Sequence, residues 1–182
     1  MRTRRRSLAK PISAVCVAAA LIAGCSSTPS TDAEAYLPSE IDGKPVRDDT
    51  PLAGEFRKQM DEQADVATYS LGTVGGPEGT PTTVAGGQIK IDDVVPELLV
   101  FAATTEKEEE KPLGDLLKGD EVSNEEIEGQ DVKFFEVGEE DVKLAFAVAQ
   151  PHKNLYAVAF AFMGGQGKAR TAITEMLKNS KS

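Results

Sequence analysis

The sequence predicts a single α+β domain over residues 39–182, in which an antiparallel β-sheet is packed by an N-terminal and a C-terminal helix. Three observations predict this fold class. Apolar residues recur every four positions over 52–60, which is the spacing of one helix face. Bulky and small side chains alternate over 144–149 and 156–162, as they do on the two faces of a strand. Helical spacing returns between Ala169 and Leu177.

The first 25 residues have the pattern of an export signal rather than of a structural element. An apolar run from Ile12 to Ile22 is followed by the small residues Ala23 and Gly24 and then by Cys25. The run is preceded by five basic residues, Arg2, Arg4, Arg5, Arg6 and Lys10. This order is typical of a cleaved signal peptide. The apolar run is too short to span a bilayer, which needs about 20 apolar residues.

A cysteine directly after Ala-Gly resembles the lipobox of bacterial lipoproteins. The resemblance implies a signal peptide over residues 1–24, cleavage just before Cys25, and a diacylglycerol on the Cys25 sulfur. We therefore expect a chain anchored by lipid to the extracytoplasmic face of the cell membrane, because two acyl chains give stable attachment. The Thr3-Arg4-Arg5 start also resembles a twin-arginine signal, but Ser7 stands where that family prefers a bulky apolar residue. The choice between Sec and twin-arginine export stays open.

The mature chain is strongly acidic. The whole sequence has 20 basic and 30 acidic residues, for a net charge of −10, and the predicted signal holds five of the basic residues and no acidic ones. The remaining chain carries about −15, and such a surface repels polyanions, which excludes nucleic acid as a partner. Cys16 leaves with the signal and Cys25 carries the lipid, so we expect no disulfide to support the fold.

Residues 25–38 predict a lipidated flexible tether between the membrane and the domain. The stretch is small, polar and contains two prolines, so it cannot bury enough apolar surface to offset the cost of ordering. Leu37, Ile41 and Val46 are the first residues that we expect to contact the domain.

Asp48-Asp49-Thr50-Pro51 predicts the start of the first helix. Thr50 is placed as N-cap, and proline is favoured at the first helical position. Leu52, Phe56 and Met60 would share one face, which predicts about three turns ending near Gln63.

The middle of the chain predicts two strands and an acidic region. Residues 66–71 and 97–105 have the strand pattern, 88–92 have it more weakly, and 72–87 predict a long loop or ragged hairpin. Residues 106–117 predict a short amphipathic helix, interrupted at Pro112 and ended by Gly119, through leucines at 113, 116 and 117. Residues 120–129 predict an acidic loop.

The glutamates of this acidic region are a candidate cation site, because calcium binds several carboxylate oxygens. They are Glu106, Glu108, Glu109 and Glu110. A calcium loop also needs a turn that brings its ligands together, usually through a central glycine, and this run has none. A solvated face is therefore the favoured interpretation, and cation binding stays open.

The last third predicts three strands, over 132–137, 141–150 and 154–162, with a hairpin at 150–153. The last two strands have one small face, called here the alanine face: Ala145, Ala147, Ala149, Ala157, Ala159 and Ala161. The opposite side, called the bulky face, has Leu144, Phe146, Val148, Tyr156, Val158, Phe160 and Phe162. Because small side chains allow close approach, we expect the final helix to cover the alanine face. A cleft left there would instead indicate a ligand site.

Gly164-Gly165-Gln166-Gly167-Lys168 follows a strand and opens a helix, which is the setting of phosphate-binding loops. The P-loop pattern fails because its first glycine would fall at Phe162 and its Ser/Thr at Ala169. The dinucleotide pattern fails because its third glycine would fall at Arg170. An anion could bind beside Lys168 and Arg170, but a plain strand-to-helix turn is the favoured interpretation.

The sequence favours a protein that is not an enzyme, with no catalytic, cofactor-binding or metal-binding residues. His152, the only histidine, is predicted in an exposed hairpin turn, away from any nucleophile motif. One histidine and no free cysteine exclude zinc or copper sites of ordinary type. Paired-carboxylate hydrolysis is not excluded, but the absence of Trp leaves few aromatic platforms for a sugar.

Two stretches, Leu37 to Asp49 and Phe56-Arg57-Lys58-Gln59-Met60, resemble uncharacterised lipoproteins of high-GC Gram-positive bacteria when taken with the closing hairpin and helix. The resemblance brings no catalytic residues. The order of helix, antiparallel strands and final helix is also similar to the PsbP/Mog1-like fold of some envelope lipoproteins. The Cys and Trp that those proteins often have in the penultimate strand are absent from residues 144–149.

Two functions are compatible with these features. The first is a non-enzymatic binding or interaction module of the cell envelope, with a protein partner. The alternative is a carrier of lipid or another apolar ligand, enclosed by a curved sheet and the alanine face. A hydrophobic content of 40% is ordinary for a globular protein, which favours the first. Exposure of Phe160 or Phe162 in a pocket would favour the carrier.

Overall fold

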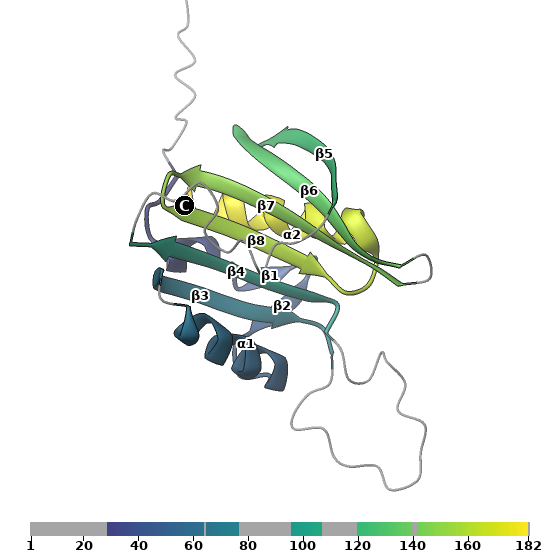
Figure 1. Ribbon diagram of the computed structural model, residues 1–182, viewed down its shortest axis with the longest axis horizontal. Coiled ribbons are helices and arrows are strands. Elements are labelled where there is room, and N and C mark those ends of the chain that lie inside the picture. Colours follow the sequence, from purple (N-terminus) through teal and green to yellow (C-terminus); the bar gives the residue numbers. More distant parts are fainter. Residues whose placement is uncertain (1–28, 64, 77–95, 107–119, 140–141, 182) are drawn as a thin grey trace, which may run out of the picture.

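A computed structural model shows an α+β fold built on one antiparallel sheet (Figure 1). The structure describes residues 29–63, 65–76, 96–106, 120–139 and 142–181. Within them, the strand order across the eight-stranded sheet is β1-β2-β3-β4-β8-β7-β6-β5. The elements are η1 (Ala33–Tyr36), β1 (Glu40–Ile41), β2 (Lys44–Arg47), α1 (Pro51–Glu62), β3 (Val66–Val74), β4 (Leu98–Thr105), β5 (Asp120–Ile127), β6 (Gln130–Glu139), β7 (Val142–His152), β8 (Leu155–Ala161) and α2 (Gly165–Asn179).

The prediction that a helix starts at Thr50-Pro51 is confirmed. The Thr50 hydroxyl accepts a hydrogen bond from the Ala53 N–H at 3.3 Å, which satisfies one of the free donors at the start of α1. Met60 is buried and Phe56 packs against the same core, as the spacing predicted. Leu52 is only half-buried, because Ala53 takes the innermost position of the first turn.

The alanine face is filled by α2, as the sequence predicted. Ala147 pairs with Ala159 and Ala149 with Ala157 across β7 and β8, and all four are fully buried. The buried residues of α2 belong to the same core cluster: Ala169, Ala172, Ile173, Met176 and Leu177. Figure 1 shows α2 behind β7 and β8, on the side of the sheet away from the viewer. Methyl side chains on both strands let the helix approach closely.

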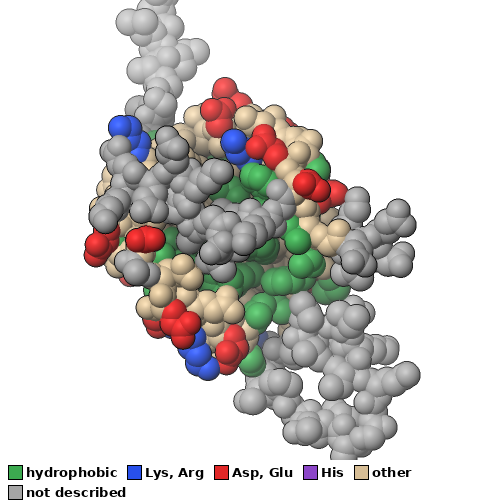
Figure 2. Space-filling view, in the orientation of Figure 1, with side chains coloured by type: hydrophobic (Ala, Val, Ile, Leu, Met, Phe, Trp, Pro, Cys, Tyr) green, Lys and Arg blue, Asp and Glu red, His purple; other side chains and the backbone are tan. Residues whose placement is uncertain are grey.

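The bulky face carries a row of neighbouring aromatic rings across the sheet, some pairs stacked and others tilted. Phe56 of α1 lies 5.2 Å from Phe101, Phe101 lies 6.4 Å from Phe160, and Phe160 and Phe135 each lie 4.9 Å from Phe146, measured between ring centroids. These separations are typical of favourable aromatic pairs. Figure 2 shows hydrophobic side chains gathered over the middle of this face. The helix α1 contacts the sheet at β3, one end of this row.

The predicted tether is wrong for residues 29–38, which pack against the domain. Ala33 and Tyr36 of η1 are buried, and the Tyr36 hydroxyl donates to the Ser30 carbonyl at 2.8 Å. The Ser30 N–H donates to the Ser180 carbonyl at 3.1 Å, which ties this segment to the end of α2. The stretch is mostly polar, but it contains Tyr36, and burial of this one large aromatic residue offsets the cost of ordering its neighbours.

Other boundaries also differ from the prediction. Residues 120–127, predicted as an acidic loop, form β5, and their charged side chains suit a strand at the sheet edge. Residues 72–74 extend β3 rather than beginning a loop, β7 continues to His152, and the β1–β2 hairpin was not predicted. The predicted strand over 88–92 lies outside the described residues, as does the helix over 106–117 apart from residue 106.

Candidate functional site

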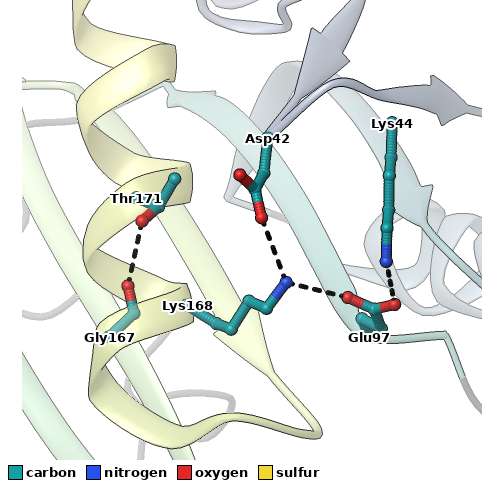
Figure 3. Close-up of polar contacts among 6 residues, drawn as sticks. All are labelled: Asp42, Lys44, Glu97, Gly167, Lys168 and Thr171. Carbon is teal, nitrogen blue, oxygen red and sulfur yellow. Dashed lines mark hydrogen bonds and ion pairs between the residues drawn. The ribbon is translucent and has the colours of Figure 1, made fainter.

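The glycine-rich turn before α2 belongs to a cluster of four charged side chains (Figure 3). The Lys168 ammonium group donates to Asp42 Oδ2 at 3.3 Å and to Glu97 Oε2 at 3.0 Å. The other oxygen of Glu97 accepts from Lys44. The cluster therefore joins the β1–β2 turn, the residue before β4 and the first turn of α2. Gly164 has φ of +80°, a conformation that glycine adopts freely.

The charges of this cluster compensate one another. Hydrogen bonds from Lys44 and Lys168 lower the pKa of the Glu97 carboxyl, and hydrogen bonds to Glu97 and Asp42 raise the pKa of the Lys168 ammonium. Glu97 therefore stays ionised and Lys168 stays protonated at neutral pH. The lysine that could have bound an anion already has two carboxylate partners. This geometry supports the plain strand-to-helix turn.

Arg170, the second cation of the turn, also contacts the protein itself. It forms an ion pair with Glu125 of β5, and its guanidinium lies 5.4 Å from the centre of the Phe134 ring. Arg170 therefore links α2 to the β5–β6 hairpin.

His152 has a structural contact. It ends β7 instead of lying in the turn, and it is half-buried. Its Nε2 lies 3.0 Å from the Pro29 carbonyl oxygen, at the start of the described chain. The prediction of an exposed hairpin turn is therefore wrong for this residue.

The remaining sequence-predicted sites lie largely outside the described residues. Cys25 is one, and of the acidic run only Glu106 is described, where its N–H donates to the Asp65 carbonyl at 3.1 Å. Within the described ranges, no group of three or more His, Cys, Asp or Glu side chains is placed to hold a metal ion. No helix in the same ranges is long and apolar enough to cross a membrane.

A groove that sequence reasoning missed lies between α1, β3 and residues 37–39, and it is called here the edge groove. Its volume is about 370 Å³. The lining residues come from four separate segments: Leu37, Pro38, Ser39, Val46, Asp48, Arg57, Tyr69, Ser70 and Leu71. No local motif signals such a groove, because it depends on where β2 ends beside β3.

Polar contacts fix the sides of the edge groove. Arg57 of α1 donates to the Asp48 carbonyl oxygen at 3.2 Å. The Tyr69 hydroxyl donates to Asp61 Oδ1 at 2.5 Å. Burial, together with the nearby Asp61 carboxylate, raises the pKa of Tyr69 to about 12. Tyr69 is therefore a neutral hydrogen-bond donor at physiological pH, which suits binding rather than proton transfer.

No family model matches this chain, and no curated protein or solved structure is significantly similar to it.

Proposed function

We propose that this chain is a bacterial lipoprotein, anchored by a diacylglycerol on Cys25 to the extracytoplasmic face of the cell membrane after cleavage of residues 1–24. Its folded part is a non-enzymatic module that binds another protein of the cell envelope. The basic, apolar and small residues that precede Cys25 support the anchor. The resemblance to uncharacterised envelope lipoproteins supports the setting.

The packing of α2 on the alanine face supports an interaction module over a carrier. A carrier needs an enclosed apolar space, and the alanine face was the wall that the sequence offered for one. Ala157 and Ala159 are fully buried in one core cluster with Ile173 and Met176 of α2. This face is therefore part of the protein core.

The contacts of four side chains with ionisable groups, His152, Lys168, Arg170 and Tyr69, support binding over catalysis. His152 contacts a backbone carbonyl, Lys168 and Arg170 form ion pairs, and the Tyr69 hydroxyl donates to Asp61 of α1. Each contact holds two parts of the fold together. An enzyme would be expected to direct such groups into one cleft.

The alternative function, a carrier of lipid or another apolar ligand, is favoured by one observation on the bulky face. Phe135, Phe160 and Phe162 are only half-buried. Exposed apolar area of this kind suits an apolar ligand or a protein partner.

The anchor is tested by labelling cells with an alkyne analogue of palmitate. The full-length chain is expected to take the label and to fractionate with membranes, whereas Cys25→Ser is expected to take none. The matched control is Cys16→Ser, whose cysteine lies inside the predicted signal and should leave labelling unchanged. Equal labelling of the wild type and the Cys25→Ser variant would contradict the anchor.

The binding function is tested by crosslinking intact cells with a lysine-reactive reagent. Lys58 is exposed on α1, near the edge groove, and is one available site. A discrete adduct with one envelope protein is expected for the lipidated chain. Absence of any adduct, from a protein shown to be folded and at the membrane, would contradict the proposal.

A further inference from the structure

The two edges of the sheet differ in how well their backbone groups are covered. At one edge, β5 is outermost, and at the other edge the short strands β1 and β2 lie beside β3. The strand β2 pairs with β3 only at Val46–Val74 and Arg47–Thr73, whereas β4 pairs with β3 from Val66 to Val74. Among the described strands, none lies beside the outer side of residues 66–71. This is about 20 Å of open strand edge, at roughly 3.3 Å per residue.

At the open edge, the backbone N–H and C=O groups of Tyr69 and Leu71 point outward, away from β4. The Val74 carbonyl accepts a hydrogen bond from the Glu97 N–H, so the backbone groups of Val74 point toward β4. Successive residues of a strand point their backbone groups to opposite sides. Thr73 therefore points toward β2, where it pairs with Arg47, and Leu71 and Tyr69 point the same way beyond the end of β2. Their N–H and C=O groups form the repeating pattern that a further strand can bind.

The edge groove lies along this same open edge. Tyr69, Ser70 and Leu71 line it from β3, Arg57 lines it from α1, and residues 37–39 line it opposite. The groove gives an incoming chain room beside the backbone groups. A cavity and an open strand edge therefore coincide at one place.

The β5 edge has charges that protect a strand edge, and the open part of β3 has none, although β3 also has a register shift, between Val66 and Thr68. Glu121, Glu125 and Glu126 place charges along β5, and a register shift between Glu121 and Ser123 interrupts its pairing. Charges and bulges of this kind discourage the addition of another strand. The sequence of β3, VATYSLGTV, has no charged residue and no proline.

The edge groove is also close to neutral on a strongly acidic protein. Its lining has one cation, Arg57, and one anion, Asp48. The chain as a whole has a net charge of −10. A partner segment without strong charge can therefore enter the groove without the repulsion that an acidic segment would meet elsewhere.

We propose that the partner binds by adding one extended, largely uncharged peptide segment to the outer side of β3, inside the edge groove. The N–H and C=O groups of Tyr69 and Leu71 pair with the backbone of this segment, which is the chemistry of strand addition. This inference rests on the proposed function, because it names the surface through which the module binds its protein partner.

The position of the edge groove agrees with the proposed anchor. Pro29, the first described residue, lies beside His152 of β7, two strands beyond β4 in the sheet order. Cys25 is four residues before Pro29, and a chain of that length spans at most about 14 Å. The lipid therefore holds the β7 end of the domain near the membrane. Figure 1 shows α1 and β3 on the side of the molecule away from the point where the described chain begins.

The experiment uses the full lipidated chain in intact cells, with a photoreactive amino acid at Ala67 on the open edge or at Glu126 on β5. Both residues are exposed. Light is expected to give an adduct with one protein at Ala67 and none at Glu126. Ser70→Lys places a charged side chain in the edge groove, and we expect the Ala67 adduct to fall about tenfold or more. If Ser70→Lys folds poorly, Ser39→Lys is used instead, because it places a charged side chain in the edge groove from the opposite side.

The matched control is Asn124→Lys, which adds the same charge to the exposed β5 edge and should leave the adduct unchanged. The crosslinked partner segment is then sequenced and synthesised. This peptide is expected to slow hydrogen exchange at the Tyr69 and Leu71 amides, and its affinity should fall about tenfold or more for Ser70→Lys but not for Asn124→Lys.

The outcomes separate the two proposals. An adduct at Glu126 instead of Ala67 overturns strand addition at β3 and leaves the binding function standing. The same holds for an Ala67 adduct that neither Ser70→Lys nor Ser39→Lys reduces, with both variants shown by thermal melting to be folded. Absence of any adduct in this experiment and in lysine crosslinking overturns both.

Discussion

The two faces of the sheet are packed in different ways, although the same strands form both. On the alanine face, small side chains from β7 and β8 meet the fifteen-residue helix α2, and the helix residues that face them are fully buried. On the bulky face, the twelve-residue helix α1 contacts the sheet at β3, and neighbouring phenylalanines continue across β4, β8, β7 and β6. Small side chains make one face into a site for a helix, and large ones make the other face into a partly exposed aromatic surface.

This difference bears on function. A face covered by a helix of the same chain has no room for a ligand, so the alanine face is core. The half-buried rings of the aromatic row and the edge groove at β3 are the surfaces that we propose for contact with other molecules. The predictions below perturb each face in turn, from the largest expected effect to the smallest.

Removing a ring from the centre of the aromatic row should have the largest effect. Phe146 is fully buried between Phe135 and Phe160, so Phe146→Ala should lower the free energy of unfolding by about 3–5 kcal/mol, through lost burial and a cavity. Urea unfolding measures the change. Val122→Ala, at a residue 44% exposed on β5, is the control and should have little effect. An equally small loss for Phe146→Ala would mean that the row is not part of the core.

Enlarging an alanine under α2 tests the other face. Ala159→Leu inserts three carbon atoms between β8 and the helix, and we expect it to lower the free energy of unfolding by about 1–3 kcal/mol. Ala67→Leu makes the same change at an exposed site on β3 and should be close to neutral. If Ala159→Leu were neutral as well, α2 would not pack closely on the alanine face.

Sequence reasoning predicted the features that depend on local chemistry. The start of α1 was predictable because Thr50 and Pro51 act on the next few residues alone. The two faces were predictable because alternation in side-chain size over 144–162 specifies which side each residue takes.

The features that sequence reasoning missed depend on distant partners or on position in the sheet. Tyr36 is buried because residues 29–38 pack against α2, which lies more than a hundred residues later in the chain. The strand β5 was missed because an acidic composition, which suits an edge, also suits a loop. The edge groove exists because β2 ends at Arg47, a tertiary feature that no short motif encodes.

The cap of α1 is the next test, because it supports the start of the helix on the bulky face. Thr50→Ala removes the hydroxyl that binds the Ala53 N–H and that lies 2.8 Å from the Thr73 hydroxyl of β3, and about 1 kcal/mol or more should be lost. Thr50→Ser keeps the hydroxyl and should retain most of the stability. Chemical denaturation of both variants measures the difference. A loss of the same size in Thr50→Ser would assign the effect to the methyl group instead of the cap.

The smallest effect should come from the ion pairs that hold α2 near β4. The folded state lowers the pKa of Glu97 below its ordinary value of 4.5, so its ionised form adds stability above that pH and the contribution is lost as the pH falls. Between pH 7 and pH 3, Glu97→Gln should therefore lose less stability than the wild type, by about 1 kcal/mol or less because the pairs are partly exposed. Thermal melting over this pH range measures it, and identical pH profiles would contradict the assignment.

The central claim is that α2 makes the alanine face part of the core, which supports the proposal that the domain binds a protein and does not carry an apolar ligand inside. Gentle mass spectrometry of residues 26–182, isolated from the native host together with an organic extract, tests it most directly. We predict the mass of the chain alone and an extract without a bound molecule in stoichiometric amount. A reproducible lipid or small apolar molecule bound one to one would contradict the claim and make the protein a carrier.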